Sequence, residues 1–127
     1  MSIKKLITGL TLSLLLASPV ANADWGDVYY CQMTNFFEIT LKGENRSYEL
    51  ERFQFKLDQT KNAMVFGSTG FFSRSEMELV KDSNWPSLEV WSADDEYSMA
   101  HFSTGKFLYA QIGFASSTTA SADCEKF

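Results

Sequence analysis

The stretch YSMAHFSTGKFLYAQI, Tyr97–Ile112, decides the fold. Short apolar-rich runs lie on both sides of a central Ser-Thr-Gly-Lys turn, which is the pattern of a β-hairpin. Folding the chain at this turn places Phe102 opposite Phe107. The next pair on the same face of the hairpin, farther from the turn, is then Ala100 and Tyr109. Both faces of the hairpin carry apolar side chains, so we expect it to lie centrally in a sheet or to have a partly covered outer surface.

Two more hairpins are predicted upstream of this stretch. Apolar residues alternate up to Leu41 and again from Tyr48 onward, with a Lys-Gly-Glu-Asn turn between the two runs. This register places Ile39 opposite Tyr48. It also places Phe37 opposite Leu50, so that all of these side chains share one face of the hairpin.

The apolar alternation changes parity near Arg52, which predicts a bulge or a break in the strand, because a slip of one residue exchanges the two faces. A polar connection then returns Met64 to Leu57. The same register places Phe66 opposite Phe55. These residues are expected to form the second hairpin.

The remaining segments are less regular. Met77 and Leu79 alternate with polar residues, Pro86 interrupts the pattern, and the pattern resumes by Val90. The Ser/Thr/Ala tract at 115–122 is compatible with either a loop or a flat strand of small residues.

Together these runs predict an all-β fold, a small antiparallel meander of about eight strands. Cys31 falls in the first strand and Cys124 in the last, and an even pair without CxxC spacing is typical of a structural disulfide. A disulfide between the first and last strands favours a closed barrel. A two-sheet sandwich bridged between its sheets satisfies the same pairing and stays open as an alternative.

Residues 1–23 have the parts of a secretory signal peptide. Lys4 and Lys5 form a basic region, an apolar run extends from residue 6 to 17, and a small-residue Ala-Asn-Ala triplet ends at Ala23. The run is shorter than the roughly 20 apolar residues of a membrane-spanning helix. We therefore expect cleavage after Ala23, a single domain at 24–127, and an exported protein, periplasmic or extracellular, without a stable membrane anchor.

The predicted mature chain is acidic. The sequence has 11 Lys and Arg residues against 16 Asp and Glu residues, and the signal peptide removes two of the lysines, leaving 9 against 16 and a net charge of −7. Such a charge repels phosphate backbones, so we expect no nucleic-acid partner. Cationic partners are easier to accommodate.

No catalytic, metal or cofactor motif stands out, so we expect a protein that is not an enzyme and has no cofactor. The single histidine, His101, faces Leu108 within the central hairpin and is interpreted as structural. The Gly-Ser-Thr-Gly sequence at 67–70 is interpreted as a turn, because it lacks the strand-turn-helix context of a nucleophile elbow. The acidic run at 94–96 lacks EF-hand spacing and is interpreted as a solvated turn.

Binding is therefore the preferred function. An N-terminal aromatic cluster is the candidate binding surface, and it consists of Trp25, Tyr29, Tyr30, Phe36 and Phe37. Adjacent aromatic pairs send one ring to each face of a strand, so one ring of each pair is free to mark a partner or ligand surface. We expect a small exported non-catalytic β-domain that acts as a binding module for a protein. An alternative is a barrel that holds a small apolar ligand, although the many phenylalanines suit a filled interior equally well.

A second alternative is a periplasmic inhibitor of a cationic hydrolase such as lysozyme. The segment Ser103-Thr104-Gly105-Lys106-Phe107 is similar to the Ser-Gly-containing loop motif of the periplasmic lysozyme inhibitors of the membrane-bound or C-type class, without reproducing its pattern. The general outline of the chain also resembles those small, exported, disulfide-tied β-barrels. The resemblance is architectural, so it implies the fold and a cationic target but assigns no residue a role.

Overall fold

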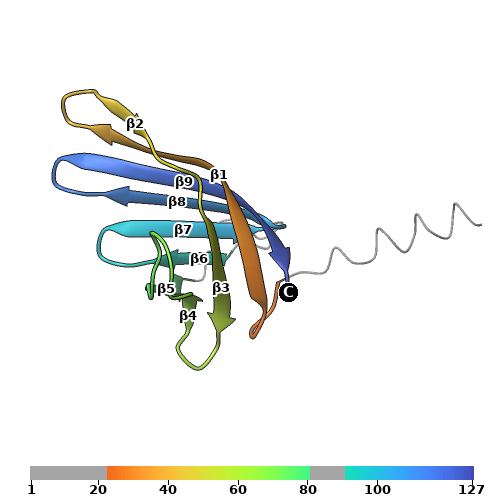
Figure 1. Ribbon diagram of the computed structural model, residues 1–127. Coiled ribbons are helices and arrows are strands. Elements are labelled where there is room, and N and C mark those ends of the chain that lie inside the picture. The colour runs from red at the N-terminus through yellow and green to blue at the C-terminus, as the bar shows by residue number, and fades with distance from the viewer. Residues whose placement is uncertain (1–22, 81–90) are drawn as a thin grey trace, which may run out of the picture.

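The computed structural model describes residues 23–80 and 91–127, and every regular element in these two ranges is a β-strand (Figure 1). The strands are β1 (Val28–Thr40), β2 (Asn45–Ser47), β3 (Arg52–Asp58), β4 (Ala63–Phe66), β5 (Glu76–Val80), β6 (Trp91–Asp94), β7 (Ser98–Ser103), β8 (Lys106–Ile112) and β9 (Ser116–Lys126). The predicted signal peptide up to residue 22, the break at Pro86 and the pattern resuming by Val90 lie outside the described residues.

Eight of the strands close into an antiparallel barrel. Neighbours run in the order β1-β3-β4-β5-β6-β7-β8-β9, and β9 pairs again with β1 to complete the ring. The extra strand β2 pairs with the end of β1 that extends beyond β3. The ladder between β1 and β9 is the longest, extending from Tyr29 opposite Lys126 to Thr40 opposite Ser116. The all-β meander is confirmed, and of the two predicted architectures the structure has the barrel.

The predicted disulfide is confirmed and lies at the closing seam. Cys31 and Cys124 are directly opposite each other in the β1–β9 ladder and are bonded across a sequence separation of 93 residues. The bond therefore joins the first strand of the barrel to the last.

Two of the predicted hairpin registers are also confirmed. In β7 and β8, Phe102 is opposite Phe107, and the neighbouring pairs follow the predicted register. In β3 and β4, Met64 is opposite Leu57. The predicted change of parity near Arg52 is a break, because β2 ends at Ser47 and β3 begins at Arg52.

The predicted register of the first hairpin is wrong. Phe37 is opposite Ser47 rather than Leu50, and Ile39 is opposite Asn45 rather than Tyr48. The chain turns earlier than expected, because Gly43 adopts a positive φ of 83° that a glycine tolerates without strain. The amide of Gly43 donates to the carbonyl of Thr40 and closes this tighter turn.

The small-residue tract forms a strand, β9, rather than a loop. Its inward side chains include Thr118, Ala120 and Ala122, all buried. Their small size leaves room for large rings from the opposite wall of the barrel, as in other small barrels that alternate small and large interior residues.

Those rings fill the interior. Phe107 lies within about 6 Å, centroid to centroid, of four rings, those of Phe53, Phe55, Phe66 and Phe72. Phe55 in turn stacks against Tyr29 at 5.5 Å. The centre of the barrel is a packed aromatic core.

One side of the sheet extends beyond the barrel. In Figure 1 the β1–β2 hairpin and the adjoining ends of β8 and β9 project past the shorter strands β4, β5 and β6. A bulge between Met33 and Asn35 shifts the register of β1 near the base of this extension. Beyond the bulge Phe36 faces inward and Phe37 faces outward.

Candidate functional site

The adjacent aromatic pairs divide between the core and the surface, as expected. Tyr29 is buried whereas Tyr30 is 46% exposed, and Phe36 is buried whereas Phe37 is half-buried. The strand period of two explains this division, because neighbouring side chains point to opposite faces.

The structure does not bring the five predicted aromatics onto one surface. Trp25 packs edge-on against Trp91 with 5.1 Å between the ring centroids, and both rings lie against the core. Tyr30 lies on the outside of β1 and contacts Phe127 at 5.2 Å. Tyr29 belongs to the core, so its ring contributes nothing to an exposed surface.

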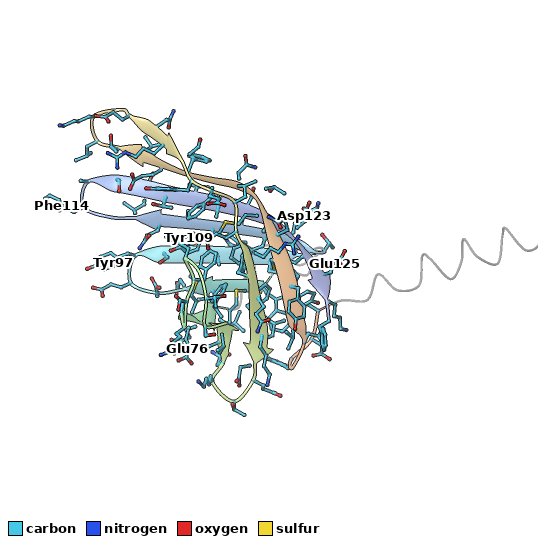
Figure 2. The ribbon with its side chains drawn as sticks, in the orientation of Figure 1. Glu76, Tyr97, Tyr109, Phe114, Asp123 and Glu125 are labelled. Atoms are coloured by element: carbon cyan, nitrogen blue, oxygen red, sulfur yellow. A yellow bond between two sulfur atoms is a disulfide. The ribbon has the colours of Figure 1, made fainter. Side chains whose placement is uncertain are left out.

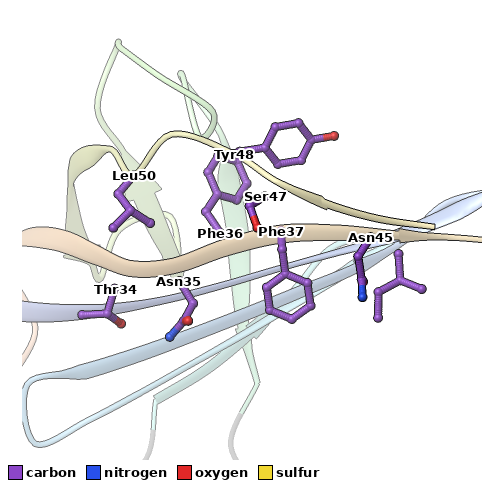
Figure 3. Close-up of a pocket in the computed structure, with 9 residues that line it drawn as sticks. Thr34, Asn35, Phe36, Phe37, Asn45, Ser47, Tyr48 and Leu50 are labelled. Atoms are coloured by element: carbon purple, nitrogen blue, oxygen red, sulfur yellow. The ribbon is translucent and has the colours of Figure 1, made fainter. Parts of the chain in front are cut away.

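The other two aromatics border a groove of about 550 Å³ beside β1 and β2 (Figure 3). Figure 3 shows Phe37 and Asn35 on the outer side of β1 and Phe36 on the other side. The amide of Asn35 donates to Ser121 Oγ at 2.9 Å, which fixes the groove to the neighbouring strand β9. Of the five predicted residues, Phe37 alone points outward into this region.

The outer surface next to the groove is a sheet face with unusually few charges. From the strand register, the outward positions of β1, β9, β8 and β7 lie side by side there. We call this surface the uncharged face, and it consists of Phe37, Ile39, Ser117, Thr119, Ser121, Leu108, Ala110, Ile112, Met99 and His101. None of these is Asp, Glu, Lys or Arg, although 21% of the chain is charged. An outward sheet face normally carries polar residues.

Exposed apolar side chains lie on both sides of the small side chains of β9, which run along the middle of the uncharged face. Leu108 is 50% exposed, Ile112 is 71% exposed and Met99 is 49% exposed on one side, and Ile39 is exposed on the other. The strip between them belongs to β9, whose outward residues are serine and threonine. A contiguous exposed apolar patch on a folded domain typically marks an interaction surface.

Charges begin where the uncharged face ends. At the end of the face near the β7–β8 turn, Lys106 Nζ forms an ion pair with Asp123 Oδ1 at 2.6 Å. At its side, Asp94 is opposite Met99 in the β6–β7 ladder and opposite Glu78 in the β5–β6 ladder. Like charges directly opposite each other across strands are destabilising.

The adjacent β6–β7 turn adds two more carboxylates. We call Glu78, Asp94, Asp95 and Glu96 together the acidic edge; all four are exposed, and none forms an ion pair with another described residue. Asp95 Oδ1 instead accepts hydrogen bonds from the amides of Tyr97 and Ser98, which organises the turn. The apolar patch is therefore flanked by carboxylates that have no ion-pair partner in the part of the chain that the structure describes.

Part of this surface was predictable from the sequence. The apolar outer face of the β7–β8 hairpin follows from the apolar residues on both faces of Tyr97–Ile112, but its continuation across β9 to Phe37 depends on the β1–β9 pairing. Among residues 23–80 and 91–127, no group of three or more His, Cys, Asp or Glu is placed to hold a metal ion. The same ranges contain no helix long and apolar enough to span a membrane.

Comparisons of the chain with protein-family models, with curated proteins and with solved structures found no match.

Proposed function

We propose that this protein is a small exported, non-catalytic binding module that docks a cationic partner protein on the uncharged face. The observation that carries the proposal is the run of outward positions without Asp, Glu, Lys or Arg across four neighbouring strands. The exposed side chains of Met99, Leu108 and Ile112 form an apolar patch bordered by the Ser/Thr strip of β9 and by the acidic edge, and an apolar patch with a polar rim is the usual anatomy of a protein interface. The packed aromatic core favours this surface over the alternative of an apolar ligand held inside the barrel.

The acidic edge indicates that the partner protein is positively charged. Glu78 and Asp94 are opposite each other and form no ion pair with a described residue, and the predicted mature chain has a net charge of −7. A partner that brings Lys or Arg beside its own apolar surface relieves this repulsion and is steered toward the site. Inhibition of a cationic hydrolase such as lysozyme is the specific form of the function that this charge pattern favours.

A charge placed in the middle of the uncharged face tests the proposal. We expect Leu108→Lys to weaken binding of a cationic lysozyme by about tenfold or more, because the ammonium group meets both an apolar surface and a cationic partner. Binding of the unaltered protein should weaken as the ionic strength rises. Affinity is measured by calorimetry, with hydrolysis of cell-wall substrate followed in parallel.

Gln59→Lys is the matched control, since it adds the same charge at an exposed turn residue outside the uncharged face. It should change the affinity by less than about twofold, through long-range charge alone. Equal losses in Leu108→Lys and Gln59→Lys, or no binding of lysozyme at low ionic strength, would overturn the proposal.

Export is supported by the disulfide, which is typical of proteins that fold in an oxidising compartment. It is also supported by the geometry beside the expected cleavage point. The backbone nitrogen of Asp24 donates to Asp27 Oδ2 at 2.8 Å, and Lys126 Nζ lies 3.3 Å from the same oxygen. Cleavage after Ala23 turns that nitrogen into a charged α-ammonium group facing a carboxylate.

The new terminus should therefore stabilise the processed chain. We expect Asp27→Asn to lower its free energy of unfolding by on the order of 1 kcal/mol, because a charged hydrogen bond is lost. The loss should shrink when the amine of Asp24 is acetylated, and Asp24→Asn serves as the control. Denaturant unfolding measures both effects. This expectation is contradicted if the mass of the mature protein does not correspond to a chain that begins at Asp24. It is also contradicted if acetylation leaves the effect of Asp27→Asn unaltered.

A further inference from the structure

A second concave site lies at the mouth of the barrel, on the inner side of the sheet, and it shares Asp95 with the acidic edge. It has a volume of about 220 Å³. We call it the mouth pocket, and the residues used below are Phe71, Phe72, Asp95, Ser98, Tyr109 and Gln111. Figure 2 labels Tyr109 within the outline of the barrel, whereas Tyr97 and Phe114 project from the ends of the strands.

Aromatic rings form one wall of the mouth pocket. Phe71 is 40% exposed, yet its ring is held edge-on by Phe36 at 5.0 Å and by Phe72 at 5.1 Å. Tyr109 lies 5.7 Å from Phe71 and 4.8 Å from Phe72. An aromatic side chain that is both exposed and fixed by its neighbours offers a preformed surface to a ligand.

Polar groups form the opposite wall. Asp95 Oδ1 accepts hydrogen bonds from the amides of Tyr97 and Ser98 and from Ser98 Oγ at 2.8 Å. Among residues 23–80 and 91–127, no hydrogen bond ends on Oδ2 of the same carboxylate and no Lys or Arg lines the pocket. The carboxylate is thus fixed in position by one oxygen while the other keeps its capacity to accept.

The Tyr109 hydroxyl remains neutral at physiological pH. Burial raises the pKa of Tyr109 above its ordinary value, and the hydrogen bond with Ser98 opposes this effect. The site therefore has one negative charge, from Asp95, set against neutral aromatic rings.

We propose that the mouth pocket binds a guanidinium or ammonium group carried on a short apolar stem. The exposed ring of Phe71 attracts a cation through its quadrupole, and the buried ring of Tyr109 supports Phe71 from behind. Asp95 Oδ2 and the side-chain carbonyl of Gln111 accept its N–H groups, and the apolar stem lies against Phe72. A free small molecule and a Lys or Arg side chain of a docked protein share this chemistry.

Titration with butylguanidinium tests the proposal, with the amide resonances of Ser98 and Gln111 as reporters. Both resonances should shift in a saturable manner, and butylammonium should act in the same way. Butanol and pentanoate, which have the same butyl stem without a positive charge, should bind at least about fivefold more weakly. Equal binding of butanol and butylguanidinium would overturn the proposal.

Two variants separate the parts of the site. Asp95→Asn keeps an oxygen for the turn amides and removes the charge, and Phe71→Leu keeps an apolar side chain and removes the ring. Each should weaken butylguanidinium binding about fivefold or more. Glu125→Gln removes an exposed carboxylate outside the pocket and should have no more than about a twofold effect. An unchanged affinity in Asp95→Asn would sink the idea.

The same titration distinguishes the source of the cation and separates this proposal from docking on the uncharged face. Leu108→Lys should leave butylguanidinium affinity within about twofold, since its side chain lies on the outer surface. Displacement of butylguanidinium by lysozyme identifies a partner side chain as the occupant. Continued binding of both together identifies a free small cation.

Discussion

Replacing both Cys31 and Cys124 by alanine lowers the free energy of unfolding by about 4–5 kcal/mol, because the disulfide closes a long loop and so restricts the unfolded chain. The loop spans a sequence separation of 93 residues. This loss is a large share of the roughly 5–15 kcal/mol that stabilise a typical domain. The shift of the urea midpoint measures it.

The variant should still fold in the absence of denaturant. The β1–β9 ladder extends from Tyr29 to Thr40, so hydrogen bonds close the barrel even without the sulfur bridge. The unaltered protein with and without a thiol reductant provides a control that involves no change of side chain. A loss below about 1 kcal/mol in both experiments contradicts the role of the disulfide in restricting the unfolded chain.

Phe107→Ala should cost about 3–5 kcal/mol, because it removes a ring from the packed centre of the barrel and leaves a cavity. Its ring is 2% exposed and contacts aromatic rings from β3 and β4. The next residue supplies the comparison: Leu108 points outward and is 50% exposed, so Leu108→Ala should cost less than about 1 kcal/mol.

Chemical denaturation of the two variants compares these losses directly. If Phe107→Ala does not fold, Phe107→Leu keeps part of the packing and should show an intermediate loss. Equal losses at positions 107 and 108 contradict the inward and outward assignment of β8, on which the uncharged face depends.

The extent to which sequence predicts this fold varies along the chain. The β7–β8 hairpin was predictable in register because its Thr104-Gly105 turn fits a two-residue loop, with both residues at positive φ. The Met64–Leu57 pairing was predictable because apolar and polar residues alternate along β3, and a short polar connection leads into the continuous apolar run of β4. In both cases local pattern and tertiary packing agree.

The predicted register of the first hairpin was wrong for a physical reason. Tyr48 and Leu50 are partly exposed rather than buried, so their alternation with polar residues does not reflect a core-facing side. The position of the turn, set by Gly43, decides the register there. Only the β7–β8 part of the uncharged face could be predicted from the sequence. Phe37 belongs to the face because of the bulge after Met33 and the non-local pairing of β1 with β9, and neither feature could be predicted locally.

The mouth pocket was not visible in the sequence at all. It combines Phe71 from the β4–β5 loop, Asp95 from the β6–β7 turn and Tyr109 from β8. From the sequence alone, Asp95 was expected in a solvated turn and Tyr109 in a hairpin, with nothing to connect the two. Barrel closure alone brings them together.

The methionine methyl resonances of the processed protein test docking on the uncharged face most directly. Met33, Met64 and Met77 are buried, whereas Met99 lies on the uncharged face at 49% exposure. On titration with a cationic lysozyme at low ionic strength, we predict that the Met99 methyl signal shifts or broadens while the three buried methyl signals stay in place. An unchanged Met99 signal at saturating lysozyme would contradict docking on this face.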